Sequence, residues 1–267
     1  MINFLNLWNI SWNEYHKYSL SFSQYIKTNK ELVKLINFQE WQIIIDLACW
    51  TWLTTLEILK QNSDIKKIYA IDFSNNMLDI AKKMIKSKKV EFICSDVKNI
   101  DKFINEKADI IVCNSAFWQF DDKNLIINKI HSLLKNGWKF IFNLNQQFFD
   151  FWYEENYQKI LIDEIFNEIK SKWYNITSWL LKNKLKIDEI KDIFKKQWFI
   201  LIDHKIINFW KKTLKEFIEF FKIPATATFF ENIPKKEQNI ILKNVYNKLK
   251  NKFEINNNQW IYFIFSK

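Results

Sequence analysis

The amino-acid sequence predicts an α/β protein built on a mostly parallel sheet of seven strands with helices on both faces. Short runs of apolar, β-branched residues alternate with longer amphipathic segments, the pattern of strands buried on both sides and joined by helical crossovers. The chain has 267 residues, 48% of them hydrophobic, enough for one large core or one core with an added layer. No apolar run reaches the roughly 18 residues of a membrane helix, so no membrane partner is expected.

Strands and helices alternate in the first half of the chain. The first 40 residues are predicted to be mainly helical, including 29–38. The predicted strands span 42–47, 67–72, 90–96, 109–117 and 139–145. The predicted helices span 53–62, 74–87 with a Ser or Asn cap, a short segment near 99–105, and 123–134. The "NGW" at 136–138 is predicted to be a turn.

After residue 145 the pattern becomes helical and rich in aromatic residues. Helices are predicted at 146–176, 183–197, 212–223 and 235–253, and strands at 199–209 and from 260 onward. We therefore divide the chain into N-terminal helices (1–40), a ligand-binding core (41–145), a helical cap insertion (146–197), and the last two strands with a helical insertion (198–267).

The charge gives little reason to expect a nucleic-acid partner. The formal charge is +10, and all 40 basic residues are lysine. Proteins that hold phosphates and base edges usually rely on arginine, which is absent here. Cys49, Cys94 and Cys113 stand alone without metal-ligand spacing and are predicted to be small core residues of a reduced, cytoplasmic protein. No metal is expected.

Polar residues gather where the predicted parallel strands end. Ligands of such sheets bind beyond the carboxyl ends of the strands, where the strand order reverses. The sequence places there Asp46 to Trp52, Asp72, Ser95 and Asp96, Asn114 to Trp118, and Asn143 to Asn145.

The order of these motifs resembles that of the class I S-adenosylmethionine (SAM)-dependent methyltransferases. Their first motif, acidic-x-Gly-x-Gly-x-Gly, aligns with "DLACWTW", which has Ala48, Trp50 and Trp52 at the glycine positions. "DFSNNMLDIA", "CSD", "CNSAFWQF" and "LLKNGWKFIF" match later motifs in the expected order, and the resemblance covers about residues 14–142. It implies a Rossmann-like sheet with an antiparallel edge, and SAM as the cofactor.

The resemblance also implies which residues form the site. Cofactor contacts are expected at Asp46, Ala48, Cys49, Trp50, Thr51, Trp52, Asp72, Phe73, Met77, Ser95, Asp96, Val97, Asn114 and Ser115. Trp118 is expected to line the substrate pocket. The catalytic residues are unknown, with Tyr15, His16 and Tyr18 as candidates.

Several of these residues have structural alternatives. Asp72 could cap the following helix, and Asp96 could stabilise a turn. Met77 and Cys49 could be core residues without a ligand contact. His131 lies in an amphipathic helix and is predicted to be structural.

Glycine is nearly missing from a chain that should need it. There is one glycine, Gly137, where average usage predicts about 19, and there are 13 tryptophans. As written, Trp50 and Trp52 are expected to fill the space of the cofactor's methionine and ribose.

The tryptophans have three possible explanations. They could be genuine in a protein that lost catalysis, could stack on another flat ligand, or could stand for glycines encoded by UGA. Several fall at glycine-like sites: Trp41, Trp50, Trp52, Trp138, Trp198 and Trp260.

We therefore predict a SAM-dependent methyltransferase acting on a small, partly apolar acceptor, to which the aromatic cap would be suited. Two alternatives stay open: a noncatalytic binding protein of the same fold, and an RNA methyltransferase. The acceptor and the oligomeric state do not follow from the sequence.

Overall fold

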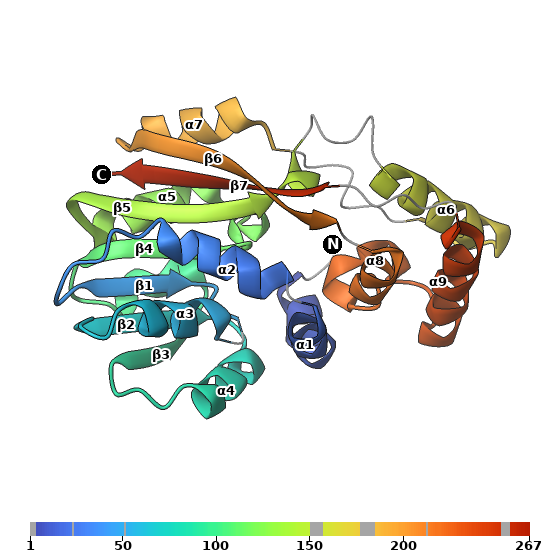
Figure 1. The fold of residues 1–267 in the computed structure, drawn as a ribbon, viewed down its shortest axis with the longest axis horizontal. Helices are drawn as coiled ribbons and strands as arrows, with labels where there is room; N and C mark the ends of the chain where they lie inside the picture. The colour runs from blue at the N-terminus through green and yellow to red at the C-terminus, as the bar shows by residue number, and fades with distance from the viewer. Residues whose placement is uncertain are drawn as a thin grey trace. The chain divides into compact units, whose positions relative to one another are not determined.

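A seven-stranded sheet in the order β3-β2-β1-β4-β5-β7-β6 is the centre of the fold (Figure 1). The computed structural model describes residues 4–22, 24–50, 52–149, 157–176, 185–211, 213–251 and 257–267. The strands are β1 (Ile43–Leu47), β2 (Lys67–Asp72), β3 (Val90–Cys94), β4 (Ala108–Asn114), β5 (Leu134–Asn145), β6 (Ile200–Lys211) and β7 (Asn257–Ser266). The predicted fold class is confirmed.

The strand pairing gives the sheet one switch point. β1 pairs in parallel with β2 on one side and with β4 on the other, so the chain reverses its direction of travel across the sheet between them. β2–β3 and β4–β5 are also parallel, and β7 pairs antiparallel with β5. The antiparallel edge expected from the resemblance is therefore present, and a ligand is expected beyond the carboxyl ends of β1 and β4.

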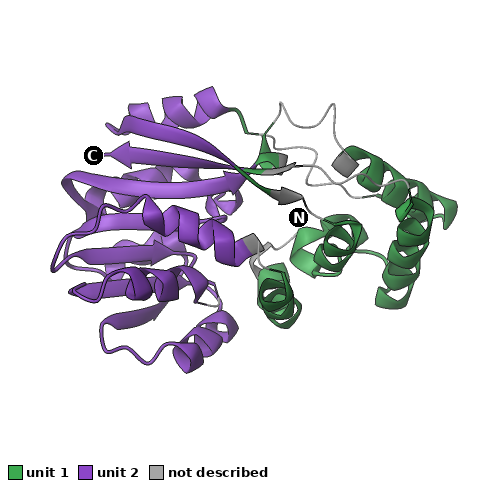
Figure 2. Cartoon of the chain, viewed as in Figure 1, with its two compact units in different colours: residues 1–22, 146–186, 208–259 green, residues 23–145, 187–207, 260–267 purple. Residues whose placement is uncertain are grey.

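The described residues fall into two compact units (Figure 2). The sheet unit comprises Ser23–Asn145, Ile187–Ile207 and Trp260–Lys267, and the helical unit comprises Met1–Phe22, Gln146–Lys186 and Asn208–Gln259. No helix among these described residues combines the length and apolar character needed to cross a bilayer.

Helices cover the sheet within its own unit. They are α2 (Gln24–Lys34), α3 (Leu53–Gln61), α4 (Asn75–Met84), α5 (Lys123–Leu133) and α7 (Ile187–Lys196), with the 3-10 helices η1 (Val97–Lys102) and η2 (Phe117–Gln119). α2 and α3 contact each other in front of the sheet in Figure 1, and α5 lies behind it. The main chain of β1 and β4 is thereby enclosed, as their continuous apolar runs predict.

An aromatic core fills the space between β5, β7 and α7. Phe142 of β5 stacks on Phe263 of β7 with ring centroids 5.0 Å apart, and Phe194 of α7 stacks on Phe265 at 4.0 Å. Stacked pairs of this kind contribute about 0.5–1.5 kcal/mol beyond the area that they bury. The antiparallel edge is thus held to the sheet by side chains as well as by its hydrogen bonds.

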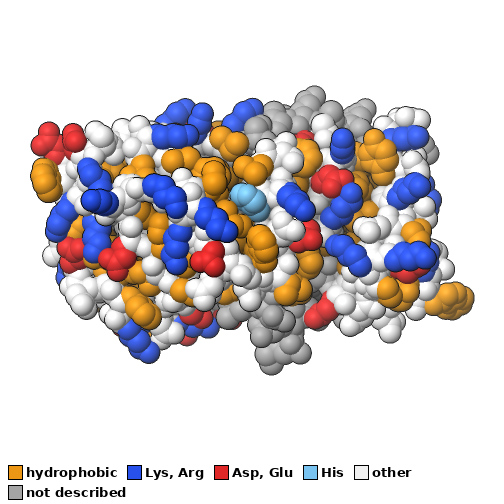
Figure 3. Space-filling view, turned by 90° about the horizontal axis from the view of Figure 1, so that it is seen from below, with side chains coloured by type: hydrophobic (Ala, Val, Ile, Leu, Met, Phe, Trp, Pro, Cys, Tyr) orange, Lys and Arg blue, Asp and Glu red, His pale blue; other side chains and the backbone are white. Residues whose placement is uncertain are grey.

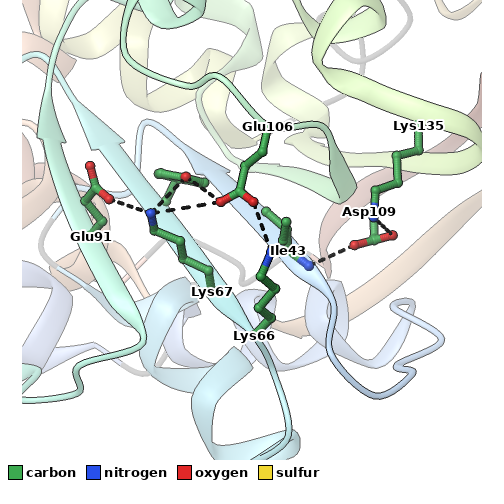
Figure 4. A network of polar contacts seen from close by, with 8 residues as sticks. Ile43, Lys66, Lys67, Glu91, Glu106, Asp109 and Lys135 are labelled. Atoms are coloured by element: carbon green, nitrogen blue, oxygen red, sulfur yellow. Dashed lines mark hydrogen bonds and ion pairs between the residues drawn. The ribbon is translucent and has the colours of Figure 1, made fainter.

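Polar contacts bind the strands together at their amino ends, opposite the predicted site (Figure 4). The buried carboxylate of Asp109 accepts hydrogen bonds from the Ile43 N–H (2.8 Å) and from Lys135 Nζ (2.7 Å). Nearby, Glu106 accepts from Lys66 Nζ at 3.1 Å. β1, β4 and β5 are therefore joined at this edge by one acidic side chain.

The helical unit is built from α1 (Phe4–Ser21), α6 (Tyr157–Ser171), α8 (Leu214–Phe220) and α9 (Lys235–Leu249), with short 3-10 turns at 146–148, 224–226 and 228–230. Glu168 of α6 accepts from Asn244 Nδ2 (3.0 Å) and from Lys248 Nζ (2.5 Å), both on α9. Thr213 and Glu216 form a reciprocal capping box at the start of α8.

Two local predictions are wrong. The expected turn at 136–138 lies inside β5, where Ala108 pairs with Leu134 but Ile110 pairs with Lys139. The extra residues bulge out of the ladder, and Gly137 (φ 77°) donates its N–H to the Lys267 carbonyl. Cys94, expected in the core, is exposed at the end of β3.

Candidate functional site

Asp46 places a buried carboxyl group at the end of β1. One oxygen, Oδ2, accepts the Thr55 hydroxyl at 2.6 Å, and the other, Oδ1, has no hydrogen-bond partner among the described residues. Burial, with the nearby charge of Asp72 adding to it, raises the pKa of Asp46 to about 7, against the lowering effect of the Thr55 contact. Thr55 was not among the predicted residues. A polar residue in the first turn after the motif was the signal that could have identified it.

Asp72, at the end of β2, joins the two loops that follow β1 and β2. Its Oδ2 accepts the Trp50 N–H at 3.0 Å and its Oδ1 accepts the Ser74 N–H at 2.9 Å. Burial raises the pKa of Asp72 to about 6, against the lowering effect of these amide groups. Ser74 itself caps α4 by accepting the Met77 N–H, so the helix-capping alternative for Asp72 is wrong.

The loop after β1 has the backbone shape of a glycine-rich loop without its glycines. Ala48 and Trp50 both have φ 53°, and Trp52 has φ 112°. These are the three positions that align with the motif glycines, and all three lie in the region that favours glycine. The loop is fixed at its centre by the Cys49 N–H, which donates to the Ile71 carbonyl at 2.9 Å.

The two indoles take different directions. Trp52 is buried in an apolar cluster with Ala81 and Ile85, and its Nε1 has no hydrogen-bond partner among the described residues. The expectation that both indoles fill the ligand's space is therefore wrong for Trp52. Trp50 is half-buried, and its ring lies 6.4 Å from that of Tyr25 on α2.

The end of β3 is organised around a turn. The Ser95 N–H donates to the Asp72 carbonyl at 2.9 Å, which joins this turn to the end of β2. Asp96 is half-buried and caps η1 by accepting the Lys98 N–H at 2.9 Å, while Val97 is buried. The turn-stabilising role considered for Asp96 is therefore present, and its contact with a cofactor stays a prediction.

The end of β4 contributes further polar atoms. Ser115 has φ 61° and donates its N–H to Asn143 Oδ1 at 2.8 Å, while its carbonyl accepts the Trp118 indole N–H at 3.0 Å. Asn114 Oδ1 and Ser115 Oγ are buried without hydrogen-bond partners among the described residues. A strained backbone beside unpartnered polar atoms is typical of a binding site.

The structure groups most, but not all, of the predicted residues. Asp46, Asp72, Asn114 and Ser115 end strands that are neighbours in the sheet, with Phe73 and Met77 following Asp72. Thr51 lies outside the described residues.

The remaining predicted residues lie elsewhere. Cys49 packs its side chain into the core with Ala70 and Leu78. Tyr15, His16 and Tyr18 belong to α1 in the helical unit. Tyr15 packs edge-on against Trp8, and the ring of Tyr18 contacts that of Phe220 at a tilt. The parts of the chain that the structure describes hold no cluster of three His, Cys, Asp or Glu side chains suited to a metal.

The residues present fit the group that the resemblance implies. Neither Asp46 nor Asp72 takes part in an ion pair between described residues. Unpartnered oxygens on Asp46, Asn114 and Ser115 can accept hydrogen bonds from ammonium and hydroxyl groups. A ligand that carries positive charge and ribose hydroxyls, as SAM does, would satisfy both needs.

The chain is similar in sequence to several methyltransferases. A family model described as "Methyltransferase domain" matches residues 45–142. The chain is 30% identical over 127 residues to a malonyl-[acyl-carrier protein] O-methyltransferase of Acetivibrio thermocellus, an alignment that covers 46% of this chain and 44% of that protein. It is 22% identical over 198 residues to a demethylmenaquinone methyltransferase of Geobacillus stearothermophilus, covering 71% of this chain and 84% of that protein. The chain thus matches less than half the length of the first relative.

A solved structure extends the likeness to the fold. Haemonchus contortus phosphoethanolamine N-methyltransferase 2, in complex with SAM, matches with a TM-score of 0.61 and 17% identity, over 100% of this chain and 60% of that one. At this identity the likeness concerns the fold alone. Residues 45–142 are thus similar to a methyltransferase domain, and the strand order with the structural likeness shows a Rossmann-like sheet.

Proposed function

We propose that this protein is a SAM-dependent methyltransferase whose acceptor is a small, partly apolar molecule. The observation that carries the proposal is the pair of buried carboxyl groups, Asp46 and Asp72, at the carboxyl edge beside the switch point. Burying two acids beside each other is unfavourable unless something compensates them. A cationic ligand that also donates hydroxyl groups would do so, and the domain match favours SAM.

Each residue has a defined role in this proposal. The Asp72 oxygens accept backbone N–H groups, among them those of Trp50 and Ser74, and would also accept a hydrogen bond from a ribose hydroxyl. Asp46 Oδ1 would accept a hydrogen bond from the ammonium group of the methionine moiety, and binding would favour the ionised form of Asp46. Met77 and Phe73 would border the adenine, and Asp96 would accept a hydrogen bond from the adenine amino group.

The bound cofactor supplies a methyl group on a sulfonium. The chain would then align the acceptor with that methyl group and exclude water, which can provide much of the rate without a dedicated base. Burial lowers the pKa of His16, which favours its neutral imidazole. His16, Tyr15 and Tyr18 therefore stay candidates for proton transfer, and Trp118 for the wall of the acceptor pocket.

The relatives differ in the acceptor that their names give, a malonyl group on acyl-carrier protein in one and demethylmenaquinone in the other. The acceptor of this chain is therefore best sought among small organic molecules that carry an apolar part.

Calorimetric titration with SAM tests the cofactor. We expect the Trp50→Gly, Trp52→Gly double variant to bind SAM at least tenfold more tightly than the chain as written. Trp41→Gly makes the same chemical change outside the site and should leave binding unchanged. Asp72→Asn in the double variant should weaken binding about tenfold, the effect of losing a charge-assisted hydrogen bond.

Two outcomes would count against the proposal. If the double variant binds no SAM at millimolar concentration, the methyltransferase proposal fails. If it binds SAM but transfers no labelled methyl group to malonyl-acyl-carrier protein, demethylmenaquinone or phosphoethanolamine, or to small molecules extracted from the host, the noncatalytic alternative is favoured.

A further inference from the structure

We infer that five tryptophans of the written sequence are glycines in the protein that the cell makes. The five are Trp41, Trp50, Trp52, Trp173 and Trp198. The inference concerns the identity of residues at five positions, and only two of these positions, both in the loop after β1, belong to the candidate site. It therefore stands apart from the proposed methyl transfer.

The first observation is the backbone conformation. Seven non-glycine residues among those described have positive φ, and five of the seven are tryptophan, with φ between 53° and 112°. For a bulky side chain this conformation is a clear outlier. None of the seven is Asn or Asp, the residues that otherwise tolerate it best, although the chain is rich in Asn. Tryptophan therefore occupies the positions where this fold requires glycine.

Two helix ends show the requirement most clearly. After α6, the Trp173 N–H donates to the Lys170 carbonyl at 2.9 Å and the Tyr174 N–H donates to the Ile169 carbonyl at 3.3 Å. This paired arrangement is the Schellman motif, and it places Trp173 (φ 64°) at the position that is usually glycine.

The end of α7 repeats the arrangement. The Trp198 N–H donates to the Lys195 carbonyl and the Phe199 N–H to the Phe194 carbonyl, both at 3.1 Å. Phe194 and Phe199 also make the apolar contact that accompanies the motif, with ring centroids 5.5 Å apart. Trp198, with φ 65°, again holds the glycine position.

The tryptophan side chains at the three positions outside the loop after β1 are largely exposed to solvent. Trp41, Trp173 and Trp198 are 74%, 95% and 83% exposed, although tryptophan is normally mostly buried. In the loop, Trp52 is buried but leaves its indole N–H without a partner among the described residues. At the three exposed positions the fold therefore uses the backbone of the residue and has no evident use for the indole.

Other tryptophans behave differently. Trp8 lies inside α1, is buried and packs edge-on against Tyr15. Trp260 pairs with Asn145 in the antiparallel ladder, and Trp138 follows the glycine that itself adopts positive φ. The backbone at these positions accepts any residue, so the inference is confined to the five.

A single cause would produce this pattern. If the cell reads UGA as glycine, a translation that reads UGA as tryptophan removes glycines and inserts tryptophans at the same positions. Such a misreading would change the deduced sequence and not the protein itself, whose turns would have the backbone conformation of glycine, as at these five positions.

The decisive experiment determines the peptides of the protein purified from its own host. We expect TGA codons at the five positions and tandem mass spectra that read glycine at each. Tryptophan in the peptides at any of the five positions would overturn the inference there, whether or not the protein binds SAM. A SAM titration that fails while the peptides read glycine would reject the proposed function and leave this inference intact.

A stability series gives an independent readout. Trp41→Gly, Trp173→Gly and Trp198→Gly should each raise the denaturant midpoint by a few tenths of a molar, because each relieves strain and removes almost no packing. Trp8→Gly is the matched control and should lower the midpoint, since it opens a core site in a helix. A lowered midpoint for all three exposed positions would contradict the inference.

Discussion

At the scale of single residues, the site is governed by two acids that the fold buries close together. Asp46 has its pKa raised to about 7 by burial, whereas an aspartate in an unfolded chain titrates near about 3.9. Between pH about 4 and about 7, Asp46 is therefore protonated in the folded protein and ionised in the unfolded chain. The stabilising effect is complete below pH about 4 and is lost as the pH rises through about 7.

This linkage predicts a pH-dependent stability without ligand. The free energy of unfolding should fall with rising pH in that window, by on the order of 1.4 kcal/mol per pH unit for each acid that is still protonated. Asp46→Asn should make the slope shallower and leave the part that comes from Asp72, whose pKa is raised to about 6. Urea unfolding followed at several pH values measures this. An Asp46→Asn variant with the original slope would show that Asp46 is already ionised in the folded protein.

Ala48 allows the strain of the loop to be measured without a large side chain. Its φ of 53° is expected to cost roughly 1–2 kcal/mol, and a glycine loses roughly 0.5–1 kcal/mol more backbone entropy on folding. Ala48→Gly should therefore stabilise the protein by about 0.5–1 kcal/mol.

The matched control for this change is Ala70→Gly on β2, where the backbone is extended. It should destabilise the protein by at least about 0.5–1 kcal/mol, because glycine loses more backbone entropy on folding and the change also removes a buried methyl group. If both changes lower the urea midpoint equally, the loop after β1 is not strained at Ala48.

At the scale of elements, the polar groups at the two ends of the strands differ in whether they have hydrogen-bond partners. The carboxyl ends hold polar atoms without partners, whereas at the amino ends Asp109 joins the start of β1 to Lys135 of β5. Asp109→Ala should lower the free energy of unfolding by about 1–3 kcal/mol, since it leaves the buried Ile43 N–H without an acceptor. Lys135→Ala should cost less, about 0–1 kcal/mol, because Lys135 is 41% exposed and water can replace it.

Thermal or urea unfolding of the two variants measures this difference, and SAM affinity serves as the control. Neither change should alter the affinity, because both lie at the amino end of the sheet. An Asp109→Ala variant as stable as the parent would show that the Ile43 amide finds another partner.

Some of these elements can be predicted from the sequence alone, and others cannot. The strands that carry Asp46, Asp72 and Asn114 were predictable because short apolar runs specify buried strands. The end of β4 was not, since the predicted strand 109–117 extends past its observed end at Asn114. The bulge around Gly137 was not, since its geometry is set by hydrogen bonds to Lys267, 130 residues later in the chain. The direction of the Trp52 side chain depended on α4, which the local pattern around the motif does not contain.

At the scale of the whole molecule, segments distant in sequence combine into each unit. The helical unit takes residues from 1–22, 146–186 and 208–259, whereas α7 and β6 up to Ile207 belong to the sheet unit. Local periodicity predicts individual helices such as α6 and α9, but the Glu168–Lys248 contact between them links positions 80 apart. Such pairings become visible only in the folded chain.

The charge of the whole molecule leads to the last prediction, which concerns nucleic acid. The net charge of +10 comes from lysine alone, and several lysines are already paired, such as Lys172 with Glu237 and Lys248 with Glu164. On the face shown in Figure 3, lysine side chains are spread among acidic and apolar ones and do not form one continuous strip. We therefore expect only nonspecific RNA binding that falls to background by about 0.2 M salt.

Filter binding of single-stranded and duplex RNA at low and high salt measures this, with the same RNAs in competition. Retention of one RNA at high salt, resistant to competition by the other, would instead favour the RNA methyltransferase alternative, because salt-resistant selective binding requires contacts beyond phosphate neutralisation.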